Sequence, residues 1–163
     1  MVATVDGVTP EGQTGQDPGV LRAELPASPA SARQARSAVR RALAAWGIGD
    51  PSGDAELLAS ELVANSAEHA RGPISLALRR RAQPDGRRGI TCEVTDTSPG
   101  MPRPRQAGPD DERGRGLAIV AALAADRGVR AGPGGKTAWF TLALRDRIEQ
   151  AAPQAQAEHE AGA

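Results

Sequence analysis

The sequence predicts an α+β fold, a two-layer sandwich in which helices cover one face of a mostly antiparallel mixed sheet. Two observations carry this prediction. Three segments show the apolar spacing of helices, and four shorter segments show the apolar patterns of strands. Their order along the chain is strand, helix, helix, strand, strand, helix, strand, which allows the helices to gather on one side of the sheet.

The first strand and the first helix lie in the amino-terminal third of the chain. Val20–Leu25 reads as a short strand. Ser28 is expected to cap a helix whose first turn holds Pro29, because serine caps and proline at the first turn are typical of helix starts. This helix is predicted to run to about Trp46, with Ala35, Val39, Leu43 and Trp46 on its inner face.

A loop and two strands connected as a hairpin surround the second helix. Gly47–Gly53 is the loop, and its Asp50 or Ser52 is suited to cap the helix predicted at Asp54–Ala70. Ile74–Arg81 alternates, with Ile74, Leu76 and Leu78 pointing inward, and Ile90–Asp96 is its partner strand. The Asp85-Gly86 pair between them favours a hairpin turn.

The carboxyl-terminal half contains a long loop, the third helix and the last strand. Thr97–Arg113 reads as a loop, and a loop of this length inside a domain is usually functional, such as a lid, or else disordered. Gly116–Asp126 reads as the helix and Thr137–Leu144 as the strand. We therefore expect a domain over residues 19–145, a disordered tail at 1–18, and a flexible or frayed helical tail at 146–163.

Composition narrows the classes of function. Twenty basic residues balance twenty acidic ones, so no net field attracts nucleic acid or a membrane. Two Trp, one Phe and no Tyr argue against a function that stacks the bases of single-stranded nucleic acid. The arginines at 79–81 and 87–88 border the hairpin and fit a solvated edge, with a DNA-contact patch as the alternative. Cys92 is the single cysteine, and we expect a buried reduced thiol.

The expected location is the cytoplasm. No apolar stretch approaches the length of a membrane span, and the chain opens without the basic and apolar regions of a secretion signal. The sequence therefore predicts a protein that is neither exported nor inserted in a membrane.

The most informative feature is a polar stripe on the second predicted helix. Glu61, Asn65 and His69 recur every four residues, so they share one face with Leu58 and Leu62. A helix that only packs would carry apolar side chains there, because burying an unpaired carboxylate costs several kcal/mol. The stripe predicts a polar cavity facing the helix. A solvated surface helix with chance spacing is the alternative reading.

Three further segments complete a recognisable set of motifs. Ile90–Gly100 ends in Asp-x-Ser-x-Gly, Glu112–Gly128 contains Gly-Arg-Gly-Leu, and Gly134–Leu144 begins with Gly-x-Thr. With Glu-x-x-x-Asn on the second helix, these motifs resemble the N-box and the three glycine boxes of the GHKL ATP-binding superfamily. The wordings ELVANSAEHA and GRGLAIV resemble most the branch of anti-sigma factor serine kinases. The resemblance covers roughly Val20–Leu144.

The resemblance implies an ATP site between the helices and the sheet, with Mg²⁺ bridging the phosphates. It assigns Asn65 as the Mg²⁺ ligand, in keeping with the preference of Mg²⁺ for oxygen. It assigns Glu61, one turn earlier, as the general base of phosphoryl transfer. A satisfied buried amide is the alternative for Asn65. His69 either orients a phosphate or Glu61, or is a packed histidine that closes the helix.

The resemblance assigns the adenine base to Asp96. A carboxylate accepts a hydrogen bond from the exocyclic amine of adenine, whereas the carbonyl of guanine would face it with a second acceptor. Gly100 would let the backbone approach the base. Thr137 matches a threonine that supports the adenine contact. Ser98 stands where the usual pattern has a glycine, and an Asx turn is the alternative role of Asp96.

The phosphates are assigned to the start of the third predicted helix. Backbone N–H groups at a helix amino terminus favour anions, and the flanking arginines add charge. The residues concerned are Gly114, Arg115, Gly116 and Leu117, with Arg113 beside them. A solvated, flexible glycine turn is the alternative.

The sequence around Lys136 resembles a second nucleotide-binding motif, which the spacing excludes. Gly135-Lys136-Thr137 looks like the end of a P-loop, but Arg130 stands where the first glycine is required, and a strand follows in place of a helix.

By resemblance, the protein is a serine/threonine-protein kinase and a regulator of transcription. It would phosphorylate a small anti-sigma factor antagonist of the STAS type and bind a sigma factor or a similar regulator, as a possible homodimer. It would contact neither nucleic acid nor membrane directly. The alternatives are a non-catalytic ATP-gated protein-binding module and a detached ATPase module that serves a multi-protein sensor.

Overall fold

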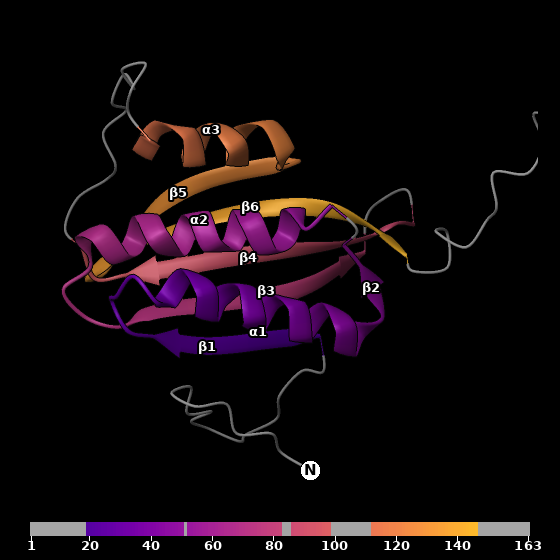
Figure 1. Ribbon diagram of the computed structural model, residues 1–163, viewed down its shortest axis with the longest axis horizontal. Helices are drawn as coiled ribbons and strands as arrows, with labels where there is room; N and C mark the ends of the chain where they lie inside the picture. Colours follow the sequence, from indigo (N-terminus) through magenta and orange to yellow (C-terminus); the bar gives the residue numbers. More distant parts are fainter. Residues whose placement is uncertain (1–18, 51, 83–85, 99–111, 147–163) are drawn as a thin grey trace, which may run out of the picture.

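The computed structural model describes residues 19–50, 52–82, 86–98 and 112–146, and these form two layers (Figure 1). The described elements in chain order are β1 (Val20–Leu25), α1 (Ser31–Trp46), β2 (Ile48–Gly49), α2 (Asp54–His69), β3 (Ile74–Ala82), β4 (Arg88–Asp96), α3 (Glu112–Leu123), β5 (Asp126–Gly132) and β6 (Gly135–Asp146). Helices α1 and α2 lie side by side over the sheet, and α3 lies beyond α2, on the side of the molecule where β5 is (Figure 1).

The sheet is antiparallel throughout the described residues. Its strands lie in the order β1-β3-β4-β6-β2, and β5 also pairs with β6. The register aligns Leu21, Leu78, Cys92 and Phe140 in one row across four strands. Because alternate residues of a strand share a face, this row and its neighbours form the floor of the core. The predicted α+β sandwich is confirmed, with no parallel pair in the described sheet.

The core lies between this floor and the helices. The predicted inner residues of α1, Ala35, Val39 and Leu43, are buried, and Trp46 is partly buried against the core. Helix α2 contributes Leu58, Leu62 and Val63 among others. Fully burying one such side chain contributes about 1.5–3 kcal/mol, so the apolar faces stabilise the packing of both helices on the sheet. None of the described helices is long and apolar enough to cross a bilayer.

Helix α1 begins later than predicted. Its first residue is Ser31 after Ala30, and no side chain caps it. The Ser31 amide donates to the carbonyl of Ser28 at 3.1 Å, and its hydroxyl donates to the carbonyl of Pro26. Residues 28–31 therefore form a turn that precedes the helix, and the assignment of Ser28 as the cap is wrong. The helix ends at Gly47, whose left-handed backbone (φ 65°) fits glycine.

The third helix and the strand after it differ most from prediction. Helix α3 starts at Glu112, within the predicted loop, and stops at Leu123. Residues 126–132 form β5, of which only Asp126 belongs to the predicted helix, and the sequence analysis predicts no element for the rest. Pro133 followed by Gly134 with φ 89° is typical of a type II turn, and it joins β5 to β6. Pairing with β6 therefore adds a strand that the sequence analysis did not predict.

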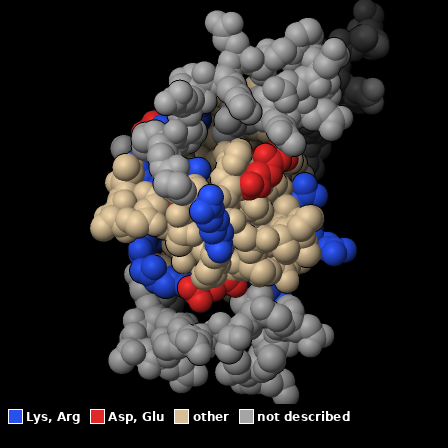
Figure 2. Space-filling view, turned by 90° about the vertical axis from the view of Figure 1, so that its left-hand side faces the viewer, with Lys and Arg blue, Asp and Glu red and all other residues tan. Residues whose placement is uncertain are grey.

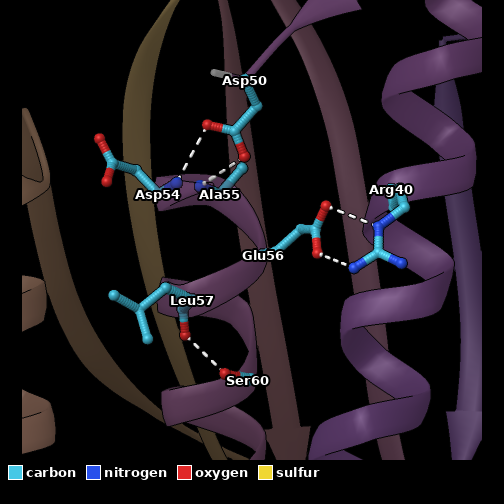
Figure 3. A network of polar contacts seen from close by, with 7 residues as sticks. All are labelled: Arg40, Asp50, Asp54, Ala55, Glu56, Leu57 and Ser60. Atoms are coloured by element: carbon cyan, nitrogen blue, oxygen red, sulfur yellow. Dashed lines mark hydrogen bonds and ion pairs between the residues drawn. The ribbon is translucent and has the colours of Figure 1, made fainter. Parts of the chain in front are cut away.

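Hydrogen bonds and an ion pair hold the start of α2, and the residues that make them support the fold only (Figure 3). The Asp50 carboxylate accepts hydrogen bonds from the amides of Asp54 at 3.0 Å and Ala55 at 3.1 Å. Gly53 occupies the N-cap position, and Asp50 caps the first turn of α2 from three residues before it. Partial burial raises the pKa of Asp50 above its ordinary value, against the lowering effect of these hydrogen bonds. Arg40 of α1 forms a two-point contact with Glu56, at 3.0 and 2.6 Å.

The predicted terminal tails, 1–18 and 147–163, lie outside the described residues, as do 99–111 of the predicted loop and 83–85 of the predicted hairpin turn.

Candidate functional site

The polar stripe of α2 divides into two half-buried residues and one exposed residue. Glu61 and Asn65 are half-buried, next to the buried Leu58 and Leu62. In the described part of the chain, no hydrogen bond or ion pair engages the Glu61 or Asn65 side chain. His69 is exposed at the end of the helix, so its interpretation as a packed histidine is wrong. The stripe thus leaves two polar groups with free bonding capacity at the edge of the core.

Glu61 lies directly against α3. A Cβ atom placed on Gly116 would overlap Oε2 of Glu61, so a larger residue there would force the Glu61 carboxylate to move. Since α3 begins at Glu112, Gly114 and Gly116 lie inside the helix, and the expectation that they open it is wrong. The amino-terminal turn is supplied by residues 112–115. The side chains of Arg115 and Leu117 lie outside what the structure describes.

Asp96 ends β4 and is buried, with its side chain 1% exposed. Its Oδ1 accepts a hydrogen bond from the Ser98 amide at 2.8 Å and another from the Ser98 hydroxyl. This is the Asx-type contact expected as the alternative role. Its Oδ2 has no hydrogen-bond partner among the described residues. A buried acceptor is normally satisfied, so Oδ2 has the capacity to accept a donor from a ligand such as the adenine amine.

Two backbone approaches bring neighbouring segments to the end of β4. A Cβ on Gly135 would overlap the carbonyl oxygen of Asp96, so β6 passes close to this strand end. Gly72, in the loop after α2, has room for a Cβ at 3.5 Å from the Thr97 hydroxyl. The carboxyl end of α2 and the end of β4 are therefore neighbours, as their places in Figure 1 also show.

Thr137 does not point toward the Asp96 carboxylate. Thr137 pairs in register with Thr95, and their hydroxyl oxygens are 2.8 Å apart. Because Thr95 and Asp96 are successive residues of a strand, their side chains point to opposite faces of the sheet. Thr137 thus faces away from Asp96, and its role at adenine stays a prediction. Gly100 lies outside the described residues.

Lys136 lies beside Asp96, although the sequence motif that contains it was rejected above as a P-loop. Lys136 is the register partner of Asp96, and its Nζ lies 3.7 Å from Oδ2. One signal was present in the sequence, since Lys136 is the single lysine among twenty basic residues. Its position opposite Asp96 depends on strand pairing, which the sequence does not specify by itself.

The charge on this end of the molecule is dispersed. Figure 2 views the side at the left of Figure 1, where β4 ends, and the described surface drawn there is mostly neither acidic nor basic. Blue and red side chains are separate and form no large patch of one sign on the described surface (Figure 2). Recognition at this end therefore depends on individual groups more than on a general field.

The described residues offer few side chains that could hold a metal ion. Among the described residues, no three or more His, Cys, Asp and Glu side chains are grouped to hold a metal ion. Mg²⁺ that binds with a nucleotide commonly takes one or two protein ligands and completes its shell with phosphate and water. The free amide oxygen of Asn65 fits this requirement. Cys92 lies in the core, where burial raises its thiol pKa well above the ordinary value.

Comparison with known families identifies the class of protein. A model of the histidine kinase-like ATPase domain matches residues 25–142, which span α1 through most of β6. The chain therefore belongs to the family of histidine kinase-like ATPase domains. Membership of this family implies ATP binding and an ATP-utilising activity in general. No curated protein matches the chain.

Proposed function

We propose that the protein is an ATP- and Mg²⁺-dependent serine/threonine kinase that acts in the cytoplasm on a small STAS-type antagonist protein. By this action it regulates a sigma factor or a similar regulator. The observation that carries the proposal is the position of Glu61. Its carboxylate, free of other partners in the described residues, lies at the contact of α2 with α3, beside the Gly-Arg-Gly segment proposed for the phosphates.

The proposed roles follow from the chemistry of each group. Glu61 accepts the proton of the substrate serine as the serine oxygen bonds to the γ-phosphorus and ADP leaves. Asn65, one helical turn away, offers the amide oxygen that holds Mg²⁺, and the ion supplies charge neutralisation at the phosphates. Oδ2 of Asp96 accepts the adenine amine. The amino-terminal turn of α3 offers backbone N–H groups to the phosphates.

The decisive test of the kinase is Glu61→Gln, which keeps the size of the side chain but removes the base. We expect transfer of labelled γ-phosphate to the antagonist to fall by roughly 10²–10⁴, while ATP affinity by calorimetry holds within a few-fold. Glu56→Gln is the matched control, because it makes the same change on α2 at a carboxylate that contacts Arg40. Unchanged transfer by Glu61→Gln would remove Glu61 from the mechanism.

The proposed metal ligand has its own test. Asn65→Ala removes the amide oxygen and should abolish the part of ATP binding that depends on Mg²⁺, measured by titration with and without the ion. Asn65→Asp retains an oxygen ligand and should recover part of it. Binding of Mg²⁺-ATP by Asn65→Ala as tight as in the parent protein would show that another group holds the metal.

A second candidate function is an ATP-gated protein-binding module without catalysis. The contact between Glu61 and Gly116 favours it, because a carboxylate packed on α3 is less open to a serine of another protein. Capture of partners with ATP and with ADP identifies the partner under either function. Absence of phosphate transfer to that partner by the parent protein would exclude the kinase and leave the binding module.

A further inference from the structure

Lys136, the only lysine of the chain, is buried at the proposed adenine-binding position. Its side chain is 8% exposed and that of Asp96 is 1% exposed. Its Nζ donates a hydrogen bond to the Ser98 hydroxyl at 2.8 Å and lies 3.7 Å from Oδ2 of Asp96. The Ser98 hydroxyl in turn donates to Oδ1 of Asp96. The three side chains therefore form a closed ring, which we call the Asp96–Ser98–Lys136 ring.

Such a ring is costly to bury and is not needed for packing. Removing an ammonium and a carboxylate from water carries a penalty of several kcal/mol per ion, which their attraction only partly offsets. Apolar side chains of similar volume at the same two positions would pack without that penalty. What a fully connected polar network adds is a fixed geometry for its members.

The ring fixes the two oxygens of Asp96 for different tasks. Oδ1 is engaged twice by Ser98, which sets the rotation of the carboxylate. Oδ2 faces the ammonium at a distance longer than a hydrogen bond and has no hydrogen-bond partner among the described residues. Its remaining lone pairs are therefore held in one direction and supported by a nearby positive charge.

We propose that Lys136 is a positioning residue that aims Oδ2 of Asp96 at the exocyclic amine of adenine, and so determines the preference for adenine over 6-oxopurines. This inference rests on the proposed ATP site. It assigns to Lys136 no contact with the nucleotide, because its ammonium is already directed at Ser98 and Asp96.

The test is Lys136→Met in the full chain, titrated with ATP and with ITP, which carries a carbonyl in place of the amine. Without the ammonium, Oδ2 loses its neighbouring charge and the Ser98 hydroxyl loses the donor that holds it, so the carboxylate is less firmly directed. We expect the ratio of ATP to ITP affinity to fall by roughly tenfold. Lys136→Arg, which keeps the charge, should retain part of the ratio. Ser98→Ala keeps both charges and opens the ring, so it should lower the ratio by several-fold.

Thermal unfolding without nucleotide separates positioning from stability. Lys136→Met leaves a buried carboxylate unpaired and should lower the melting temperature, and adding Asp96→Asn should recover much of the loss. A lower melting temperature with an unchanged ratio in folded Lys136→Met and Ser98→Ala proteins would make the ring merely structural. A raised ratio would mean that the ammonium itself contacts the 6-oxo group. Either result overturns the inference while the ATP site stands, whereas absence of ATP binding by the parent protein overturns both.

Discussion

Helix α2 and its surroundings contain two polar regions, and they differ in whether their polar side chains have partners within the protein. At the start of α2, the Asp50 carboxylate accepts hydrogen bonds from two backbone amides, and the Glu56 carboxylate accepts them from Arg40. Farther along, Glu61 and Asn65 engage no side chain of the described residues, and Oδ2 of neighbouring Asp96 faces Lys136 but accepts no hydrogen bond from them. Polar groups that only build the fold are satisfied within it. Polar groups left unsatisfied at the edge of a core have bonding capacity for a ligand.

The sharpest test of this contrast is Asp96→Asn, which replaces the carboxylate in the region that we propose binds the ligand. ATP binding should weaken by about 1.5–3 kcal/mol, as expected for a hydrogen bond to a charged group. Calorimetry measures the effect, and Asp126→Asn, an exposed carboxylate on β5, is the control. Equal affinity for ATP and GTP in the parent protein, or an unaffected Asp96→Asn variant, contradicts the adenine assignment.

The second test moves the strand that carries Lys136. Gly135→Ala places a methyl group on the carbonyl oxygen of Asp96, so the backbone must shift. The free energy of unfolding should fall by about 1–3 kcal/mol, and ATP affinity should fall with it. Gly132→Ala, at the other side of the same turn, meets no atom within 4 Å and is the matched control. Equal behaviour of the two variants would refute the close approach of β6 to Asp96.

The third test concerns the start of α2, where the polar side chains have partners within the protein. Asp50→Ala removes the cap of α2 and should lower the free energy of unfolding by about 1 kcal/mol, measured with denaturant. ATP affinity of the folded protein should stay the same, because the cap lies at the opposite end of α2 from the proposed site. A loss of affinity without a loss of stability would show that the two regions are coupled.

The pH dependence of the same cap gives a smaller effect with a defined sign. Burial raises the pKa of Asp50 in the folded protein, so ionisation is harder there than in the unfolded chain. Its penalty is absent below the ordinary pKa of 3.8 and develops as the pH rises through the raised folded value. The stability of the parent relative to Asp50→Asn should therefore decline over that acidic range and then level off. A rise would contradict the dominance of burial.

The smallest effect is expected at the contact between α1 and α2. Arg40 is exposed, and its hydrogen bonds to Glu56 raise its pKa. Arg40→Ala should change the midpoint of urea unfolding very little, since exposed ion pairs contribute little. Added salt should diminish even this difference. A large loss of stability on this substitution would show that the contact between Arg40 and Glu56 contributes more to stability than its exposure suggests.

Much of the fold was accessible from the sequence because its signals are local. The alternation of Ile74, Leu76 and Leu78 predicted a strand with a buried face, and all three are buried. The apolar spacing of α1 gave its inner face correctly. By contrast, β5 was not predicted, and only its first residue, Asp126, fell within a predicted helix; the segment forms a strand because β6 offers it a partner. Local propensity could not reveal that partner.

The sequence by itself determined the α+β class, the polar stripe of Glu61 and Asn65, and the acidic residue at the end of β4. Only the tertiary structure decided that Gly116 lies on Glu61, that Thr137 faces away from Asp96, and that Lys136 pairs with Asp96. The reason is physical. Periodicity along a segment fixes which residues share a face, whereas strand register and helix contact join residues far apart in the chain. One step of register would have exchanged Lys136 for Thr137.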